Sequence, residues 1–129
     1  MAVTHSTAAR NAATDAVTAL IGASGKLVFR LAGTVAAPGT AVATLSLSAT
    51  AFAAASTGTA TANAITSDTN AAGNASAVAT ATLQTSAGTV VIHCAVAASA
   101  SDINMTNGLT VAAGDTVSCS SLTYTALSA

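Results

Sequence analysis

The sequence predicts a mainly β protein, an antiparallel β-sandwich or jelly roll preceded by a short N-terminal helix. Three observations lead to this prediction. Small and apolar residues within positions 6–21 recur at the three- and four-residue spacing of a helix. From residue 26 onward the spacing changes to two, which is the period of a strand. Clusters of Gly, Asn, Asp and Ser then divide the rest of the chain into many short runs.

The predicted helix spans residues 6–21. Ser6 or Thr7 can cap its first turn, and Gly22 followed by Gly25 ends it. Its apolar stripe is narrow and rich in alanine, so the helix needs a partner surface, either on its own domain or on a neighbouring subunit. The stripe residues that we expect to form an assembly interface are Ala9, Ala13, Val17 and Leu20. The residues that we expect to face solvent are Arg10, Asn11, Thr14, Asp15 and Thr18.

Strand periodicity begins after this helix. Leu27, Phe29 and Leu31 alternate with more polar neighbours. Residues 36–39 (AAPG) carry Pro and Gly at the central positions of a type II turn. This turn leads into a second predicted strand over residues 42–49. A third predicted strand, over residues 57–66, has alanines along one side, which permit a second layer to pack closely.

The sequence of the second half of the chain predicts a hairpin and two further strands. Residues 77–85 and 89–97 pair around Ser86-Ala87-Gly88. Both faces of the second hairpin strand carry apolar residues, so we expect it to be covered on both sides. Further strands are predicted around residues 109–111 and 116–126. The resulting division is an N-terminal arm and amphipathic helix over residues 1–25 and a β body over residues 26–129.

Composition narrows the possible functions. The 129 residues fit one domain, but 36 of them are Ala and only 26 are Leu, Ile, Val or Phe, so the core is thin. Three basic and four acidic residues exclude the electrostatic footprint of a nucleic-acid-binding protein. No apolar run is long enough for a membrane span, and no basic segment followed by an apolar one indicates a signal peptide. We therefore expect a protein that is made and kept in a cytosol.

The sequence offers little for catalysis or metal binding. The two histidines, His5 and His93, lie in a terminal arm and among apolar strand residues. The acidic residues are one helical Asp15 and three turn residues, Asp68, Asp102 and Asp115, which predicts turn capping and not paired acid–base chemistry. Residues 68–73 copy part of a calcium loop, but Ala72 and Ala79 stand where ligands are required. We expect no enzyme activity, no cofactor and no metal.

The two cysteines lie at strand-like positions. Cys94 and Cys119 each have a valine two residues away, Val96 and Val117 respectively. Two cysteines cannot form a structural zinc site alone, and a cytosolic setting favours free thiols over a disulfide. The sequence therefore predicts two core thiols.

Four segments together resemble a family of small virion proteins of tailed bacteriophages. They are residues 6–13 (STAARNAA), 22–27 (GASGKL), 61–69 (TANAITSDT) and the final 114–125 (GDTVSCSSLTYT). The resemblance spans most of the chain and implies a structural role, a capsid decoration (cement) protein with a β-sandwich or jelly-roll body. Residues 75–82 (ASAVATAT) depart from the family, whose members tend to carry an aromatic-rich strand there. The family supplies no catalytic residues to transfer.

Three functions compete at this point. The first is a decoration protein on the capsid surface of a virion assembled in the host cytoplasm, with the major capsid protein as partner and a homo-oligomer, a dimer or trimer, as its state. The second is a phage head or tail fibre, or an adhesin-type surface component. The third is an ice-binding protein with threonine arrays, against which the lack of a fixed repeat counts. None of the three involves nucleic acid or a membrane.

Overall fold

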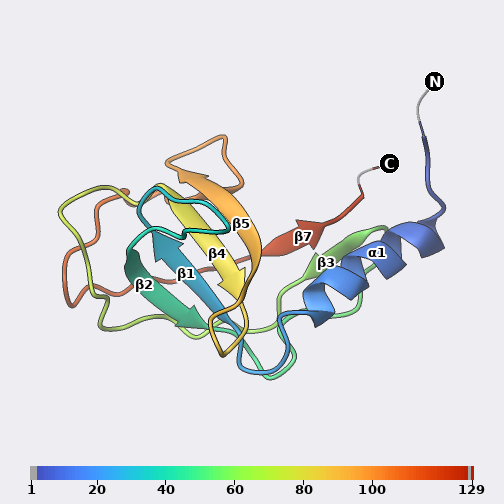
Figure 1. Ribbon diagram of the computed structural model, residues 1–129, viewed down its shortest axis with the longest axis horizontal. Helices are drawn as coiled ribbons and strands as arrows, with labels where there is room; N and C mark the ends of the chain where they lie inside the picture. Colours follow the sequence, from blue (N-terminus) through green and yellow to red (C-terminus); the bar gives the residue numbers. More distant parts are fainter. Residues whose placement is uncertain (1–2, 128) are drawn as a thin grey trace.

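Strands dominate the computed structural model, which describes residues 3–127 and 129 (Figure 1). The one helix comes first, and seven strands follow it. Five strands form a curled mixed sheet, and the other two form a separate small sheet beside the helix. The prediction of a mainly β protein with a short N-terminal helix is therefore confirmed. The elements are α1 (Thr7–Ala19), β1 (Lys26–Arg30), β2 (Ala41–Ser46), β3 (Thr59–Thr61), β4 (Thr80–Gln84), β5 (Val90–Ala97), β6 (Ile103–Asn104) and β7 (Thr123–Thr125).

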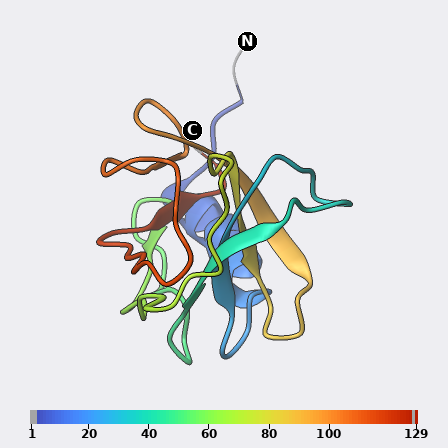
Figure 2. The same cartoon turned by 90° about the vertical axis from the view of Figure 1, so that its left-hand side faces the viewer.

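The five-stranded sheet has the order β2-β1-β4-β5-β6. Its first three pairings are antiparallel, but β5 and β6 run parallel, so the expectation of a purely antiparallel body is wrong at this edge. The parallel pair is possible because the chain from β5 to β6 turns back through an irregular loop and not through a tight hairpin. In Figure 2, β5 stands near the right-hand margin of the sheet.

The hydrophobic core lies on one face of this sheet. Leu27 on β1 stands opposite Leu45 on β2 and opposite Leu83 on β4, and all three side chains are buried. Phe29 continues the same face and is also buried. This row follows from the alternation of residues 27, 29 and 31, because alternate side chains of a strand project to the same face.

The predicted hairpin of the second half is confirmed as the β4–β5 pair, with a turn at residues 86–88. Coverage of β5 on both sides is not observed. Val96 is buried and Ala95 is exposed, and the other residues of the strand are half-buried. The sheet ends beside β5 with the two-residue strand β6, which is too short to cover it.

Several predicted strands are shorter than expected or absent. The third strand is limited to β3, because a turn occupies residues 57–58. Residues 109–111 form no strand, and the final strand is limited to β7 with an isolated bridge at Val117. The second strand ends at Ser46. Strand β6 was not predicted.

The predicted type II turn with Pro38 and Gly39 at its central positions does not form. Such a turn requires a positive φ at Gly39, and Gly39 is not among the glycines with positive φ. Instead, Thr34 N donates to Ala37 O at 3.0 Å. Gly39 is needed here for another reason: a Cβ at this position would lie 2.2 Å from the carbonyl oxygen of Leu31.

Helix α1 lies along the small β3–β7 sheet, at the far end of the molecule from the loops that precede β7 (Figure 1). Ser6 caps it as expected, because its hydroxyl oxygen accepts a hydrogen bond from Ala9 N at 3.1 Å. Within the described residues, no helix has the length and apolar character that a membrane span requires.

Candidate functional site

Polar residues of α1 attach the helix to a tight turn that precedes β3. Arg10 Nη2 donates to Thr57 O at 2.6 Å, and Asn11 Oδ1 accepts from Gly58 N at 2.7 Å. Thr14 Oγ1 donates to Gly58 O at 2.6 Å. Asp15, the next residue along the helix, accepts at Oδ1 from the backbone N–H of Ala55 at 2.8 Å. Three neighbouring polar side chains thus bind the backbone of a single turn, and a fourth binds the residue that precedes it.

The geometry of this turn explains why it needs partners. Ser56 and Thr59 exchange two backbone hydrogen bonds, and the two residues between them, Thr57 and Gly58, have φ values of 50° and 84°. A two-residue hairpin turn with both φ values positive is of the type I′ class. Its outward N–H and C=O groups have no strand to bond to, so the helix side chains satisfy them.

The expectation that these polar residues face solvent is therefore wrong. Thr14 is fully buried, with 0% of its surface exposed, and Thr18 is buried beside it. The physical reason is that the turn offers unpaired backbone groups, which only hydrogen-bonding side chains can satisfy. The helix docks on its own domain through its polar side.

Only two of the four predicted interface residues are exposed on α1. Ala9 is exposed, and Leu20 at the end of the helix has 66% of its surface exposed. Ala13 and Val17 are half-buried. We call the four residues Ala9, Ala13, Val17 and Leu20 the apolar stripe. Helix periodicity groups these four residues, but it did not show that the polar side of the helix would dock.

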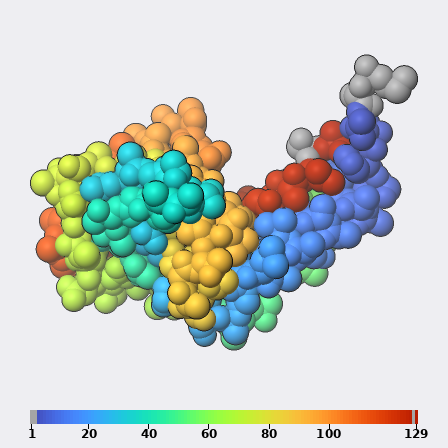
Figure 3. Space-filling view, in the orientation of Figure 1, coloured from blue at the N-terminus to red at the C-terminus, as the bar shows by residue number. Residues whose placement is uncertain are grey.

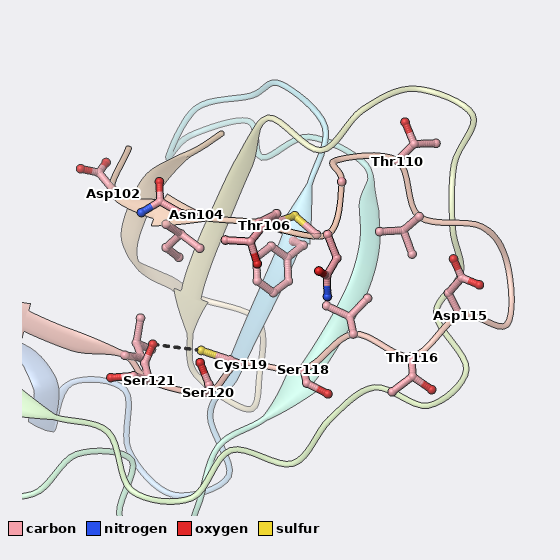
Figure 4. Close-up of a pocket in the computed structure, with 18 of the residues that line it drawn as sticks. Asp102, Asn104, Thr106, Thr110, Asp115, Thr116, Ser118, Cys119, Ser120 and Ser121 are labelled. Atoms are coloured by element: carbon pink, nitrogen blue, oxygen red, sulfur yellow. Dashed lines mark hydrogen bonds between the residues drawn. The ribbon is translucent and has the colours of Figure 1, made fainter. Parts of the chain in front are cut away.

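A second candidate site is a cavity of about 660 Å³ on the core side of the large sheet. Two chain segments, 105–111 and 116–122, border it, and buried Phe29 contributes to its lining (Figure 4). We call this cavity the slot. Asp102 and Asp115 also line it, near its two ends in Figure 4, whereas no Lys or Arg does. The slot was not predicted, because the sequence indicates strands over residues 109–111 and 116–126, and these strands do not form at its walls.

Each of the four aspartates accepts a backbone hydrogen bond. Asp68 accepts from Asn70 N at 3.0 Å, as an Asx turn does, and from Thr44 N at 2.9 Å. Asp115 accepts from Ala112 N at 2.9 Å within its own turn. Asp102 instead reaches back to Ala95 N on β5, at 3.0 Å. Among residues 3–127 and 129, no three His, Cys, Asp or Glu side chains gather as they would around a metal ion.

The two histidines lie far apart in the fold and have different surroundings. His5 is exposed, and its Nδ1 lies 2.7 Å from the carbonyl oxygen of Ala129. His93 stands opposite Thr82 on β4, and its buried Nε2 has no hydrogen-bond partner. His93 is thus half-buried among the residues of β5.

The sheet face opposite the core holds a buried polar cluster that sequence analysis missed. Arg30 donates to Thr82 Oγ1 at 3.1 Å and to Gln84 Oε1 at 2.9 Å, and its third bond, at 2.8 Å, reaches the carbonyl oxygen of Gly39. Thr82 also donates to Gln84 Oε1 at 3.0 Å. Because the guanidinium already donates to three acceptors, the cluster holds the 31–40 loop against the sheet and has no evident role in binding.

Both cysteines are free thiols and half-buried. Burial, and to a smaller extent the nearby Asp102 carboxylate, raises the pKa of Cys94 from 9.0 to about 11. Burial also raises the pKa of Cys119, and a hydrogen bond with the Ser121 backbone partly offsets this increase. Both groups are therefore protonated and weakly nucleophilic at neutral pH.

The raised pKa of Cys94 predicts a loss of stability at alkaline pH. Below about pH 9 the thiol is protonated in both the folded and unfolded states, so its contribution is fully present. Between pH 9 and 11 the unfolded chain loses this proton while the folded chain keeps it, so the free energy of unfolding falls as pH rises. Urea unfolding at about pH 8 and about pH 10.5 should show a larger loss for the natural protein than for Cys94→Ala. Equal losses in the two proteins would contradict this prediction.

Comparisons with known proteins found no match for this chain. No protein-family model matches the sequence, and no curated protein and no solved structure matches it either. The function must therefore be argued from the apolar stripe, the slot and the distribution of charge.

Proposed function

We propose that this chain is a structural virion protein of a tailed bacteriophage, a capsid decoration (cement) protein that stabilises the head by adding contacts between subunits. The observation that carries the proposal is the orientation of α1. Its polar side is satisfied by the domain, while Ala9 and Leu20 of the apolar stripe are exposed and Ala13 and Val17 are half-buried between them. An exposed apolar surface on a helix that is already docked is typical of a second contact, made with another protein.

The use of the charged groups supports a role in assembly. All four carboxylates accept backbone hydrogen bonds, and both arginines donate to the protein's own oxygens. A surface with so few unengaged ions can be covered by a neighbour at little electrostatic cost. The small Ala, Ser and Thr side chains also allow backbones to approach closely, which suits a closely packed shell.

The resemblance to small phage virion proteins favours the head over other assemblies. It rests on residues 6–13, 22–27, 61–69 and 114–125, and the first of these carries part of the apolar stripe. A β-sandwich or jelly roll, as the resemblance implies, belongs to this proposal and not to the observed fold, in which a curled mixed sheet lies beside a small two-stranded one.

The proposed partners are the major capsid protein and further copies of this chain, on the outer surface of a capsid assembled in the host cytoplasm. The role is mechanical and not enzymatic. A phage head or tail fibre, or an adhesin-type component, is the alternative, because the same surface could join copies of the chain to one another. The two roles differ in what their loss does to the particle.

Particles that lack this protein provide the test. We expect heads without it to break and release DNA at a lower temperature than complete heads, and addition of the purified protein to restore the difference. This result follows because each added contact must be lost before the shell opens. If heads without the protein keep their thermal stability but the particles no longer attach to the host, the fibre function replaces the proposed one.

A further inference from the structure

Asn107 is the one asparagine of the chain that is followed by glycine. Asparagine is chemically labile, because the backbone nitrogen of the next residue can attack the side-chain carbonyl carbon, Cγ, and expel the amide nitrogen. The attack requires an asparagine side chain that can turn toward the backbone and a following N–H that is not held in a hydrogen bond. It also requires open space around the following residue. Asn107 and Gly108 meet all of these requirements.

Both reacting groups of this pair are free. Asn107 lies in a turn that follows β6, and Asn107 and Gly108 are exposed residues that line the slot. Within the part of the chain that the structure describes, the Asn107 side chain makes no hydrogen bond and the Gly108 N–H donates none. The fold therefore neither holds this side chain away from the backbone nor engages the attacking nitrogen.

The space around Gly108 is open. Apart from its two chain neighbours, no atom lies within 4 Å of the position that a Cβ would occupy on this residue. Glycine itself carries no Cβ, so no side chain hinders the approach of its nitrogen to Cγ of Asn107. Figure 3 shows the chain that follows β5, in orange, at the surface of the molecule. The local structure therefore leaves room for the two groups to react and for water to reach them.

At each of the other asparagines the fold holds one of the two reacting groups. Four of them have a side chain that is hydrogen-bonded to the backbone, namely Asn11, Asn63, Asn74 and Asn104. Asn70 is exposed, as Asn107 is, but the next N–H, that of buried Ala71, donates to Asp115 O at 3.0 Å. Among the described asparagines, Asn107 alone combines a free side chain with a free following N–H.

We propose that Asn107 and Gly108 form a self-modification site, at which the chain converts Asn107 into aspartate or isoaspartate with water as the only co-reactant. Gly108 N bonds to Cγ of Asn107 and gives its proton to solvent. The Cγ–Nδ2 bond breaks, and Nδ2 takes up a proton and leaves as ammonia, which closes a succinimide ring. Water then opens the ring. Cleavage of the new bond between Gly108 N and Cγ gives aspartate, and cleavage of the original peptide bond gives isoaspartate.

Either product changes the charge of the slot. Asp102 and Asp115 already line it, and no Lys or Arg does, so the new carboxylate makes the slot more acidic. The formal net charge of the chain, −1, becomes more negative by one unit. Because the released ammonia is lost to solvent, the change is irreversible and accumulates as the protein ages. The inference goes beyond the proposed head function and holds equally for a shell and for a fibre.

Incubation of the folded, full-length protein in mildly alkaline buffer tests the proposal. Isoelectric focusing should show a more acidic form that accumulates with time, and peptide mapping by mass spectrometry should place the change at Asn107 and not at Asn70. A synthetic peptide of residues 103–112, incubated in parallel, gives the rate of the same sequence without the fold. Because the fold leaves both reacting groups free, Asn107 in the protein should convert at no less than about one fifth of the rate in the peptide. A slower conversion would mean that the fold protects the site, and the proposal would be wrong.

Asn107→Gln is the matched control. Glutamine keeps the side-chain amide at this exposed position, but its longer side chain must close a larger ring, so the acidic form should appear at least about tenfold more slowly than in the natural protein. Circular dichroism before and after incubation checks that both proteins stay folded. If the acidic form of the folded Asn107→Gln protein accumulates as fast as that of the natural protein, the charge change does not arise at Asn107 and the proposed site is wrong.

Discussion

Replacing Thr14 with valine should lower the free energy of unfolding by about 2–4 kcal/mol, the largest single effect that we expect from a substitution in the helix. The Thr14 hydroxyl donates to Gly58 O at 2.6 Å and accepts from Ala126 N at 3.1 Å. Valine has nearly the same shape and a similar helix propensity, so it removes the partner of one buried and one half-buried backbone group and changes little else. Urea denaturation followed by circular dichroism measures the effect.

Thr7→Val is the matched control for this substitution. Thr7 belongs to the same helix but is exposed, so the same chemical change should alter the free energy of unfolding by less than about 0.5 kcal/mol. A loss for Thr14→Val as small as that of the control would mean that the polar side of α1 does not hold the helix to the domain.

Replacing Leu20 with lysine should weaken attachment to heads by at least about tenfold and leave the fold intact. Leu20 is 66% exposed at the end of α1 and belongs to the apolar stripe. Burying a leucine in an interface contributes about 1.5–3 kcal/mol, which corresponds to a change of about tenfold or more in affinity. A lysine at a helix C-terminus is favourable for the helix itself, so stability in solution should not fall. Occupancy on heads, measured by quantitative gel analysis after centrifugation, reports the effect.

Val35→Lys is the control for attachment. Val35 is 58% exposed, but it lies outside the apolar stripe, so this variant adds the same charge without changing the proposed contact. We expect it to bind heads as the natural protein does. If Leu20→Lys also binds normally, the stripe is not the surface that contacts the shell.

The regular parts of the fold could be predicted from the sequence because local patterns determine them. The alternation at Leu27 and Phe29 placed their side chains in the core, and the hairpin of β4 and β5 follows from its turn residues. The apolar stripe follows from helix periodicity. In each of these cases the period of the pattern was sufficient.

What could not be predicted depends on contacts between distant segments. The side of α1 that docks is decided by the unpaired backbone of the Thr57–Gly58 turn, which lies more than 40 residues away in the chain. One local signal was present: a glycine inside a predicted strand indicates a turn or a bulge, and Gly58 lies inside the strand predicted over residues 57–66. No local pattern indicated the slot, because hydrogen bonds to separate loops, distant in the chain, hold its walls in place.

Electron microscopy of purified phage particles, labelled with gold-conjugated antibody against this chain, tests the central claim most directly. A decoration protein contacts the shell from outside, so the account predicts regular labelling over the head surface. It also predicts that most of this label is lost when the phage is produced with the Leu20→Lys variant in place of the natural protein. Labelling confined to the tail or its fibres, or no labelling of purified particles, would contradict it.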